Sequence, residues 1–356
     1  ALYRGHNVHD ITRSDAGAEN LTVTTDEINR IIEHSKANGR KSICFVTGVP
    51  GAGKTLVGLN IAIQRSDAQA GEHAVFLSGN FPLVTVLQEA LARDKVEQEK
   101  QRGNRVAKAD TLRSTSAFIQ IIHKYRDSFV GNDNVPPDRV AIFDEAQRAW
   151  IHDMIRKFMR TKKGVPDFHC SEPEFLISTM DRHQDWAVVI CLVGGGQEIN
   201  TGEAGLPEWF DSLKRSFPDW DVYITPQLND DEYRRGRAWS DMLSGLQTYE
   251  RDKLHLATSV RSFRTPDLAA FVKAVLDADT DEAKELYQRI KDKYPIVITR
   301  DLNKAKAWVR EQCEGTTRYG LLASSGALRL KPDGIFVKNE ISVANWFLNG
   351  KDDVRS

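Results

Sequence analysis

The chain has 356 residues, of which 40% are hydrophobic and 28% charged, a balance typical of soluble globular proteins and long enough for two domains. The formal net charge of −1 excludes an overall basic field that would attract nucleic acid, although it leaves room for a local basic groove. Four scattered cysteines without C-x-x-C spacing argue against a zinc site or a disulfide framework and favour a cytoplasmic location. The longest apolar run, 186–193, is too short to cross a bilayer, and no signal peptide is visible.

The N-terminal part is predicted to lead into a helix. Residues 1–20 are rich in polar side chains and are expected to be a linker or the end of a missing upstream region. The segment 21–36 then has isoleucines at helical spacing, and Thr24 or Thr25 is expected to be its N-cap.

The next stretch is typical of a phosphate-binding loop. Residues 42–47 (SICFVT) form a short apolar run rich in β-branched and aromatic side chains, which predicts a buried strand. Residues 48–55 (GVPGAGKT) fit the pattern G-x-x-x-x-G-K-[ST], and 56–64 predicts an apolar helix. When a strand, a glycine-rich loop and a helix follow in this order, the backbone N–H groups of the loop and the positive end of the helix dipole favour the binding of an anion. The alternative is a glycine turn that binds no ligand.

Two side chains of this loop have expected roles in nucleotide chemistry. Lys54 can reach the β- and γ-phosphates, and the hydroxyl of Thr55 can be a ligand of Mg²⁺. The residues predicted to bind the nucleotide here are Gly48, Val49, Pro50, Gly51, Ala52, Gly53, Lys54, Thr55 and Leu56.

A second strand and helix are expected downstream of the loop. Residues 74–78 predict a strand, and 83–93 a helix, with a Gly-Asn-Phe-Pro turn between them that makes another anion-binding helix start. The charged stretch 94–110 is expected to be a mobile surface excursion, whose lysines either contact nucleic acid or face solvent. Residues 114–125 have the pattern of an amphipathic helix.

The segment 140–145 (VAIFDE) predicts a buried strand that ends in two adjacent acids. Parallel strands end this way where their carboxyl ends face a ligand. Asp144 is expected to hold the Mg²⁺ shell and Glu145 to orient and deprotonate an attacking water. Alternatively, the strand simply ends in two solvated acids.

A further buried strand, 185–193, runs into a glycine-rich turn at 194–200. A polar side chain just past a strand end can sense the γ-phosphate, and Gln197 has the best position to do so. The alternative is a plain glycine turn.

The C-terminal part predicts a second unit in which strands again alternate with helices. Strands are expected at 253–258, 295–299 and 319–323, and helices at 266–276 and 302–312. The domains are therefore predicted as 21–250 and 251–356, each α/β with a doubly wound parallel sheet.

Five segments together resemble superfamily 1 helicases and their RecA-like motor domains. More narrowly, the chain resembles the bacterial Schlafen group-3-like "DNA/RNA helicase domain" family. In the expected order along nearly the whole chain, these segments are GVPGAGKT (48–55), FDEAQRAW (143–150), GGGQEIN (194–200), SVRSFR (259–264) and ASSGALRLKP (323–332).

The resemblance implies a RecA-like P-loop NTPase fold, with ATP and Mg²⁺ as ligands and one complete motor domain plus a second, partial one. Gln147 and Gln197 would couple the phosphate state to domain movement, and Arg261 would act as an arginine finger. The resemblance implies a hydrolytic core made of Lys54, Thr55, Asp144 and Glu145. It implies nucleic-acid contacts at Asn80, Phe81 and Arg329.

Two departures from the family pattern limit these expectations. The glutamine that reads adenine upstream of the loop is missing, since Thr25 stands near its place, so adenine specificity is not implied. A Q-G-L-E-type segment and an arginine-bearing one do not occur before Ser356, which is why the second motor domain is expected to be incomplete.

The sequence supports two functions and argues against two others. The first is an ATP-driven helicase or translocase on single-stranded DNA or RNA. The second is an ATP-dependent switch that gates a partner, such as a nuclease or effector domain upstream or in trans, in defence against foreign nucleic acid. A module that holds ATP without turnover has no need of the base Glu145, and a kinase has no use for the acid pair and Gln197. No membrane partner is expected.

Overall fold

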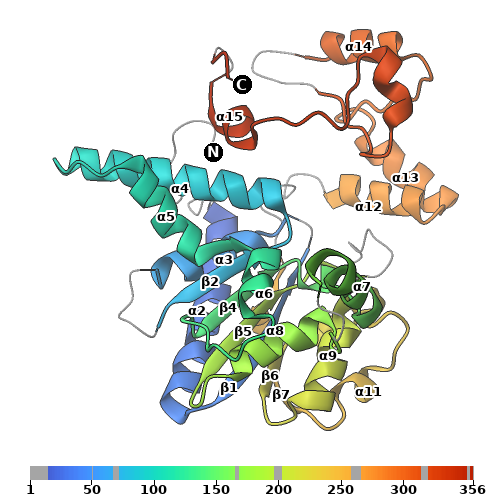
Figure 1. The fold of residues 1–356 in the computed structure, drawn as a ribbon. Coiled ribbons are helices and arrows are strands. Elements are labelled where there is room, and N and C mark those ends of the chain that lie inside the picture. The colour runs from blue at the N-terminus through green and yellow to red at the C-terminus, as the bar shows by residue number, and fades with distance from the viewer. Residues whose placement is uncertain are drawn as a thin grey trace. The chain divides into compact units, whose positions relative to one another are not determined.

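The computed structural model describes residues 15–49, 51–66, 72–164, 168–195, 203–257, 266–313, 320–350 and 353–355. The chain divides into two compact units (Figure 1). Unit 1 comprises Ala1–Arg261 and Val343–Ser356, and unit 2 is Ser262–Ser342. The assignment of 251–356 to a second RecA-like domain stays a prediction.

Unit 1 is built on an eight-stranded sheet in which every pairing is parallel. The order is β3-β2-β4-β5-β1-β6-β7, and β8 pairs with the last two residues of β1. The α/β fold class is thus confirmed for this unit. The strands are β1 (Lys41–Gly48), β2 (Ala74–Ser78), β3 (Ile119–Ile121), β4 (Val140–Asp144), β5 (Ala187–Leu192), β6 (Asp221–Ile224), β7 (Gln247–Glu250) and β8 (His255–Leu256).

Helices cover both faces of this sheet (Figure 1). Side chains alternate along a strand, so Ile43 and Phe45 of β1 enter one apolar cluster while Cys44 and Val46 enter the other. The first cluster includes side chains of α6 to α9, and the second those of α2, α3 and α4. The helices of unit 1 are α2 (Asp15–Asn38), α3 (Lys54–Gln64), α4 (Phe81–Gln101), α5 (Lys108–Phe118), α6 (Ile122–Phe129), α7 (His152–Phe158), α8 (Glu172–Asp181), α9 (Gly205–Ser216), α10 (Asp231–Arg234), α11 (Trp239–Leu243) and α15 (Val343–Leu348).

Four strands could be predicted from the sequence because both faces of the sheet are buried. The strands predicted at 42–47, 74–78, 140–145 and 185–193 are confirmed as β1, β2, β4 and β5, with ends that differ by at most two residues. Each is a continuous apolar run because each faces helices on both sides.

Three local predictions for unit 1 are wrong. Thr24 and Thr25 lie inside α2, which begins at Asp15, so neither is its N-cap. The stretch 94–110 is not a loop throughout, because α4 continues to Gln101 and packs against α5 and α15. The helix predicted at 114–125 is interrupted by β3, whose three residues pair with β2 at the sheet edge.

In unit 2, the helices α12 and α13 pack against each other. Its helices are α12 (Pro266–Leu276), α13 (Thr280–Ile290) and α14 (Leu302–Glu311), followed by a 3-10 helix at Leu328–Asp333. The rings of Phe271 in α12 and Tyr287 in α13 contact each other at a tilt of 36°, with their centroids 5.8 Å apart. The helices predicted at 266–276 and 302–312 are thus confirmed, the second one ending a residue early.

Of the strands predicted for the C-terminal part, the one at 253–258 is formed in part, as β8 (His255–Leu256) of unit 1. Those predicted at 295–299 and 319–323 are not formed in the described residues. Within 266–313 and 320–342, the described part of unit 2, no residue lies in a strand. The apolar run 295–299 has no neighbouring strand to pair with, and Ile298 is 96% exposed. The segment 320–323 likewise has no regular secondary structure, and Tyr319 lies outside the described residues. The prediction of a parallel sheet is therefore wrong for the described part of unit 2.

Candidate functional site

The loop after β1 is held against β8. The backbone N–H of Val49 donates to the carbonyl of Leu256 at 3.1 Å. A Cβ on Gly48 would lie 2.7 Å from the Cβ of Leu256, closer than such atoms approach in proteins. Gly48 is therefore required by the close approach of β8, which supports the start of the loop. Pro50 lies outside the described residues.

The rest of the loop turns sharply into α3. Gly51 and Gly53 have φ angles of 76° and 94°, in the left-handed region that favours glycine. Ala52 is buried between them, and its N–H donates to Val49 O at 3.0 Å. Gly53 is the N-cap of α3 and has no side chain to cap the first N–H groups of the helix. This end of α3, from Lys54 to the half-buried Leu56, therefore presents a positive dipole end suited to an anion.

Lys54 lies at the centre of the site without a bonded carboxylate. Its Nζ donates to the carbonyl oxygen of Gly48 at 2.7 Å. Burial lowers the pKa of Lys54, and the nearby carboxylates of Glu145, Asp144 and Glu232 oppose that change. The ammonium thus remains near three acids and available to a phosphate.

Asp144 ends β4 opposite the loop. Its Oδ1 accepts a hydrogen bond from the hydroxyl of Thr55 at 3.0 Å, and its Oδ2 accepts one from Ser78 at 3.4 Å. Burial, reinforced by the adjacent charge of Glu145, raises the pKa of Asp144 to about 6. The hydrogen bonds from Thr55 and Ser78 and the charge of Lys54 act in the opposite direction. A buried carboxylate of this kind gains by receiving a cation.

Glu145 adopts a backbone conformation that a residue with a side chain rarely takes. Its φ and ψ are 55° and 48°, so the chain reverses directly after β4. Its Oε2 accepts a hydrogen bond from Nε2 of Gln147 at 2.5 Å. The Oε1 of Gln147 accepts one from the backbone N–H of Gly194 at 3.0 Å. The buried amide of Gln147 thus joins the acid to the turn that follows β5.

The structure brings the described loop residues together with Asp144, Glu145 and Gln147. Gln197 and Arg261 lie outside the described residues. Asn80 is the N-cap of α4, where its Oδ1 accepts from the N–H of Leu83 at 3.2 Å, and the ring of Phe81 is 57% exposed. Arg329 is exposed in the 3-10 helix of unit 2.

Two residues near Lys54 were missed from the sequence. The carboxylate of Glu232, in α10, lies so close to Gly195 that a side chain there would collide with it. The Nδ1 of His255, in β8, is 2.8 Å from the hydroxyl of Thr47, and burial together with Lys54 lowers the pKa of this imidazole. Neither residue belongs to a recognisable motif, so only the fold reveals them.

The oxygens beside the loop are of a kind that could hold Mg²⁺ together with the phosphates of a nucleotide. Among the residues that the structure describes, no three His, Cys, Asp or Glu side chains cluster in a way that would hold a metal ion. Mg²⁺ commonly takes one or two protein oxygens and completes its shell with phosphate and water. Thr55 Oγ1 and Asp144 Oδ1, 3.0 Å apart, provide such a pair beside the loop.

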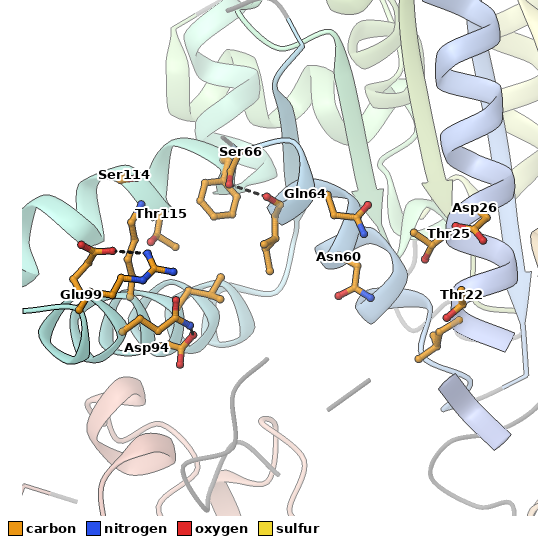
Figure 2. A pocket seen from close by; sticks show the side chains of 17 residues that line it. Thr22, Thr25, Asp26, Asn60, Gln64, Ser66, Asp94, Glu99, Ser114 and Thr115 are labelled. Atoms are coloured by element: carbon orange, nitrogen blue, oxygen red, sulfur yellow. Dashed lines mark hydrogen bonds and ion pairs between the residues drawn. The ribbon is translucent and has the colours of Figure 1, made fainter. Parts of the chain in front are cut away.

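A separate hollow of about 490 Å³ lies between α2 and α3 on one side and α4 and α5 on the other (Figure 2). Polar side chains such as Thr22, Asn60 and Asp94 line it. The phosphate loop and the two acids of β4 take no part in this lining. The hollow is therefore distinct from the site described above.

The comparisons with known proteins point to one family. The family described as "Schlafen group 3, DNA/RNA helicase domain" matches residues 41–356, which is most of the chain. No curated protein matches the chain. None of the helices in the described ranges combines the length and the apolar character needed to cross a bilayer.

Proposed function

Because the chain belongs to the Schlafen group 3 family of DNA/RNA helicase domains, we propose that it hydrolyses ATP with Mg²⁺ and uses this reaction to move on DNA or RNA. The family supports a helicase-like function. The ATPase reaction, its residues and the nucleic-acid coupling are our proposal.

One observation carries the proposal: the residues that a nucleotide needs meet at a single edge of the sheet. Thr55, from the loop after β1, is hydrogen-bonded to Asp144 at the end of β4, although the two are 89 residues apart in the chain. Glu145 follows directly. In open parallel sheets, ligands bind at the carboxyl ends of the strands.

In the proposed reaction each group has a separate task. Lys54 and the uncapped N–H groups at the start of α3 bind the β- and γ-phosphates. Glu145 accepts a proton from the attacking water, whose oxygen bonds to the γ-phosphorus as the bond to the leaving ADP oxygen breaks. Gln147 donates to the Glu145 carboxylate at 2.5 Å and so keeps it oriented.

Thr55 and Asp144 would hold Mg²⁺, and the bound ion would neutralise charge on the phosphate oxygens. The raised pKa of Asp144 supports this assignment, because a buried carboxylate with no cation bonded to it is stabilised by one.

Coupling to nucleic acid is assigned to residues outside this core. The exposed ring of Phe81, beside Asn80 at the start of α4, is suited to stacking against a base. We assign γ-phosphate sensing to Gln197, the role of arginine finger to Arg261, and a further nucleic-acid contact to Arg329. An arginine finger contributes a factor of roughly 10³ to 10⁵ to k_cat in related NTPases.

The test is the rate of phosphate release by the full chain with Mg²⁺ and ATP. It is measured without nucleic acid, with single strands and with duplex, each of DNA and of RNA. We expect single strands to stimulate release, and Phe81→Ala to weaken that stimulation while basal release is kept. Failure of every nucleic acid to change the rate would contradict the motor function.

A second function is favoured by the balanced charge of the chain, which is −1 overall. In that case the same ATPase would switch a partner or effector, such as a nuclease, in defence against foreign nucleic acid, without unwinding. ATP-dependent strand separation, together with an affinity for single strands that falls steeply with salt, would decide in favour of the motor.

A further inference from the structure

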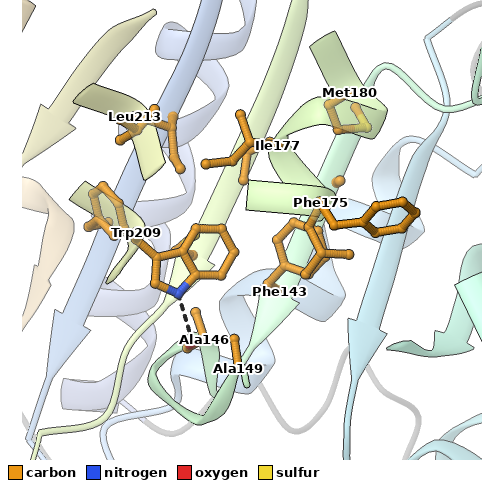
Figure 3. Close-up of a cluster of buried hydrophobic side chains, with 14 of the residues drawn as sticks. Phe143, Ala146, Ala149, Phe175, Ile177, Met180, Trp209 and Leu213 are labelled. Atoms are coloured by element: carbon orange, nitrogen blue, oxygen red, sulfur yellow. Dashed lines mark hydrogen bonds between the residues drawn. The ribbon is translucent and has the colours of Figure 1, made fainter. Parts of the chain in front are cut away.

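Trp209, on α9, is a fully buried side chain that contacts the segment after the two acids. Its indole Nε1 donates a hydrogen bond to the carbonyl oxygen of Ala146 at 2.9 Å (Figure 3). Ala146 follows Glu145 directly, so this bond fixes the peptide group between Ala146 and Gln147, one residue beyond the proposed base.

The indole ring also packs on both strands that lead into the site. Its centroid is 5.6 Å from that of Phe143, the residue before Asp144, and 6.5 Å from that of Phe45 in β1. Trp209 thus contacts the strand that carries the acids and the strand that leads into the phosphate loop.

Other bonds hold the same segment, and one of them reaches Glu145 itself, whose carbonyl oxygen accepts from the N–H of Arg148 at 2.9 Å. The N–H of Ala204 donates to the carbonyl of Ala149 at 2.7 Å, and Glu172 accepts from the N–H of Trp150 at 3.0 Å. The carbonyl oxygen of Ala146 also accepts from the N–H of Ala149, at 3.3 Å. The indole therefore makes the shorter of the two bonds to this carbonyl, which lies in the peptide group one residue beyond Glu145.

A left-handed residue with a side chain persists only where its surroundings fix it, because the conformation costs free energy. Glu145 is such a residue, and its direction determines where its carboxylate lies. We propose that Trp209 is a positioning residue: its hydrogen bond to Ala146 holds Glu145 in the left-handed conformation that aims the carboxylate at the attacking water. This inference rests on the proposed role of Glu145 as the base.

The test is Trp209→Phe, which keeps an aromatic ring and removes the N–H donor. Nucleotide binding should stay within about twofold of wild type, because the phosphate loop is untouched, while k_cat should fall about 10- to 100-fold, as expected when a catalytic group is misplaced. Trp209→naphthylalanine, which keeps the bicyclic volume, should show the same loss even if the phenylalanine variant folds poorly.

Trp220→Phe is the matched control. Trp220 is also buried, and its Nε1 donates at 3.0 Å to Asp181, near the amino end of the sheet. Its loss should lower thermal stability as Trp209→Phe does and leave k_cat unchanged. An equal effect of the two substitutions on k_cat would show that Trp209 acts only through general stability.

A cycle with Glu145→Gln separates this inference from the proposed function. If Trp209 acts through Glu145, Trp209→Phe should add nothing to the loss already caused by Glu145→Gln in single-turnover assays. Wild-type turnover by Glu145→Gln would overturn the assignment of Glu145 as the base. A large loss in Glu145→Gln together with wild-type k_cat in both Trp209 variants would overturn the positioning role alone.

Discussion

Charged side chains have different partners at the two ends of the strands in unit 1, which we call the amino edge and the carboxyl edge of the sheet. At the amino edge, charged side chains are paired: Arg40 binds both oxygens of Asp221 at 2.6 and 3.1 Å, and Lys41 binds Asp181 at 2.8 Å. At the carboxyl edge, Lys54 is bonded to a backbone carbonyl, and Asp144 is buried with only hydroxyl donors. These pairs at the amino edge are satisfied within the protein, although Asp138, just before β4, is also buried and burial raises its pKa to about 6. At the carboxyl edge, the charges of Lys54 and Asp144 lie together beside the phosphate loop, in a position to pair with a ligand.

This contrast has a cost for the folded chain. A buried carboxylate without a cation destabilises the fold, and a left-handed residue such as Glu145 stores strain. Both features occur at the carboxyl edge, where the proposed chemistry takes place. Because of this difference between the two edges, substitutions at the carboxyl edge should change turnover, and those at the amino edge should change stability.

The largest effect is expected from Lys54→Ala. Removing the ammonium eliminates the cation that would bind the β- and γ-phosphates, so turnover should fall about 10³-fold and nucleotide affinity should fall with it. Isothermal titration with a non-hydrolysable ATP analogue and phosphate release measure the two effects. Wild-type affinity in this variant would show that the loop does not hold the phosphates.

A pH series on Asp144 sharpens the comparison. In the metal-free protein the pKa of about 6 means that the carboxylate becomes protonated as the pH falls through 6. Protons should then compete with Mg²⁺, so the Mg²⁺ concentration needed for half-maximal turnover should rise below that pH. For stability the sign is opposite. A raised pKa in the folded state stabilises the nucleotide-free protein below the unfolded value of 3.8, and that stabilisation is lost as the pH rises through about 6.

Asp144→Asn should therefore abolish turnover and yet stabilise the nucleotide-free chain at pH 7.5, relative to its effect at pH 5, by about 1.4 kcal/mol. Urea unfolding of wild type and variant at the two pH values measures this difference. An identical difference at pH 5 and pH 7.5 would mean that Asp144 does not titrate as the buried site requires.

The smallest effect on turnover is expected at the amino edge. Asp221→Asn weakens the paired contact with Arg40, which should lower the free energy of unfolding by about 1–2 kcal/mol. Phosphate release at a temperature where the variant is folded should equal that of wild type. A strong loss of turnover would remove the distinction between the two edges.

The sequence was most informative where a single local cause determines structure. β1, β2, β4 and β5 are apolar because they are covered on both faces, and Gly51 and Gly53 are needed for left-handed turns. These features predicted the phosphate loop and the acid pair.

Where distant contacts decide the structure, local patterns failed. The charged second half of α4 is helical because it packs on α5 and α15 and carries pairs such as Arg102–Glu99 at 2.9 Å. Residues 119–121 join β2 rather than a helix. Glu232, His255 and Trp209 come from remote segments, so nothing near them in the sequence indicated their place.

The central claim is that the carboxyl edge of the sheet hydrolyses ATP, with Glu145 as the base. The most direct test measures phosphate release and ATP binding by the wild-type chain and by Glu145→Gln, with Mg²⁺ and single-stranded nucleic acid present. We predict that the variant binds ATP as wild type does and loses 10²- to 10⁴-fold in turnover, roughly the contribution of a general base. Equal turnover in the two proteins would contradict the claim.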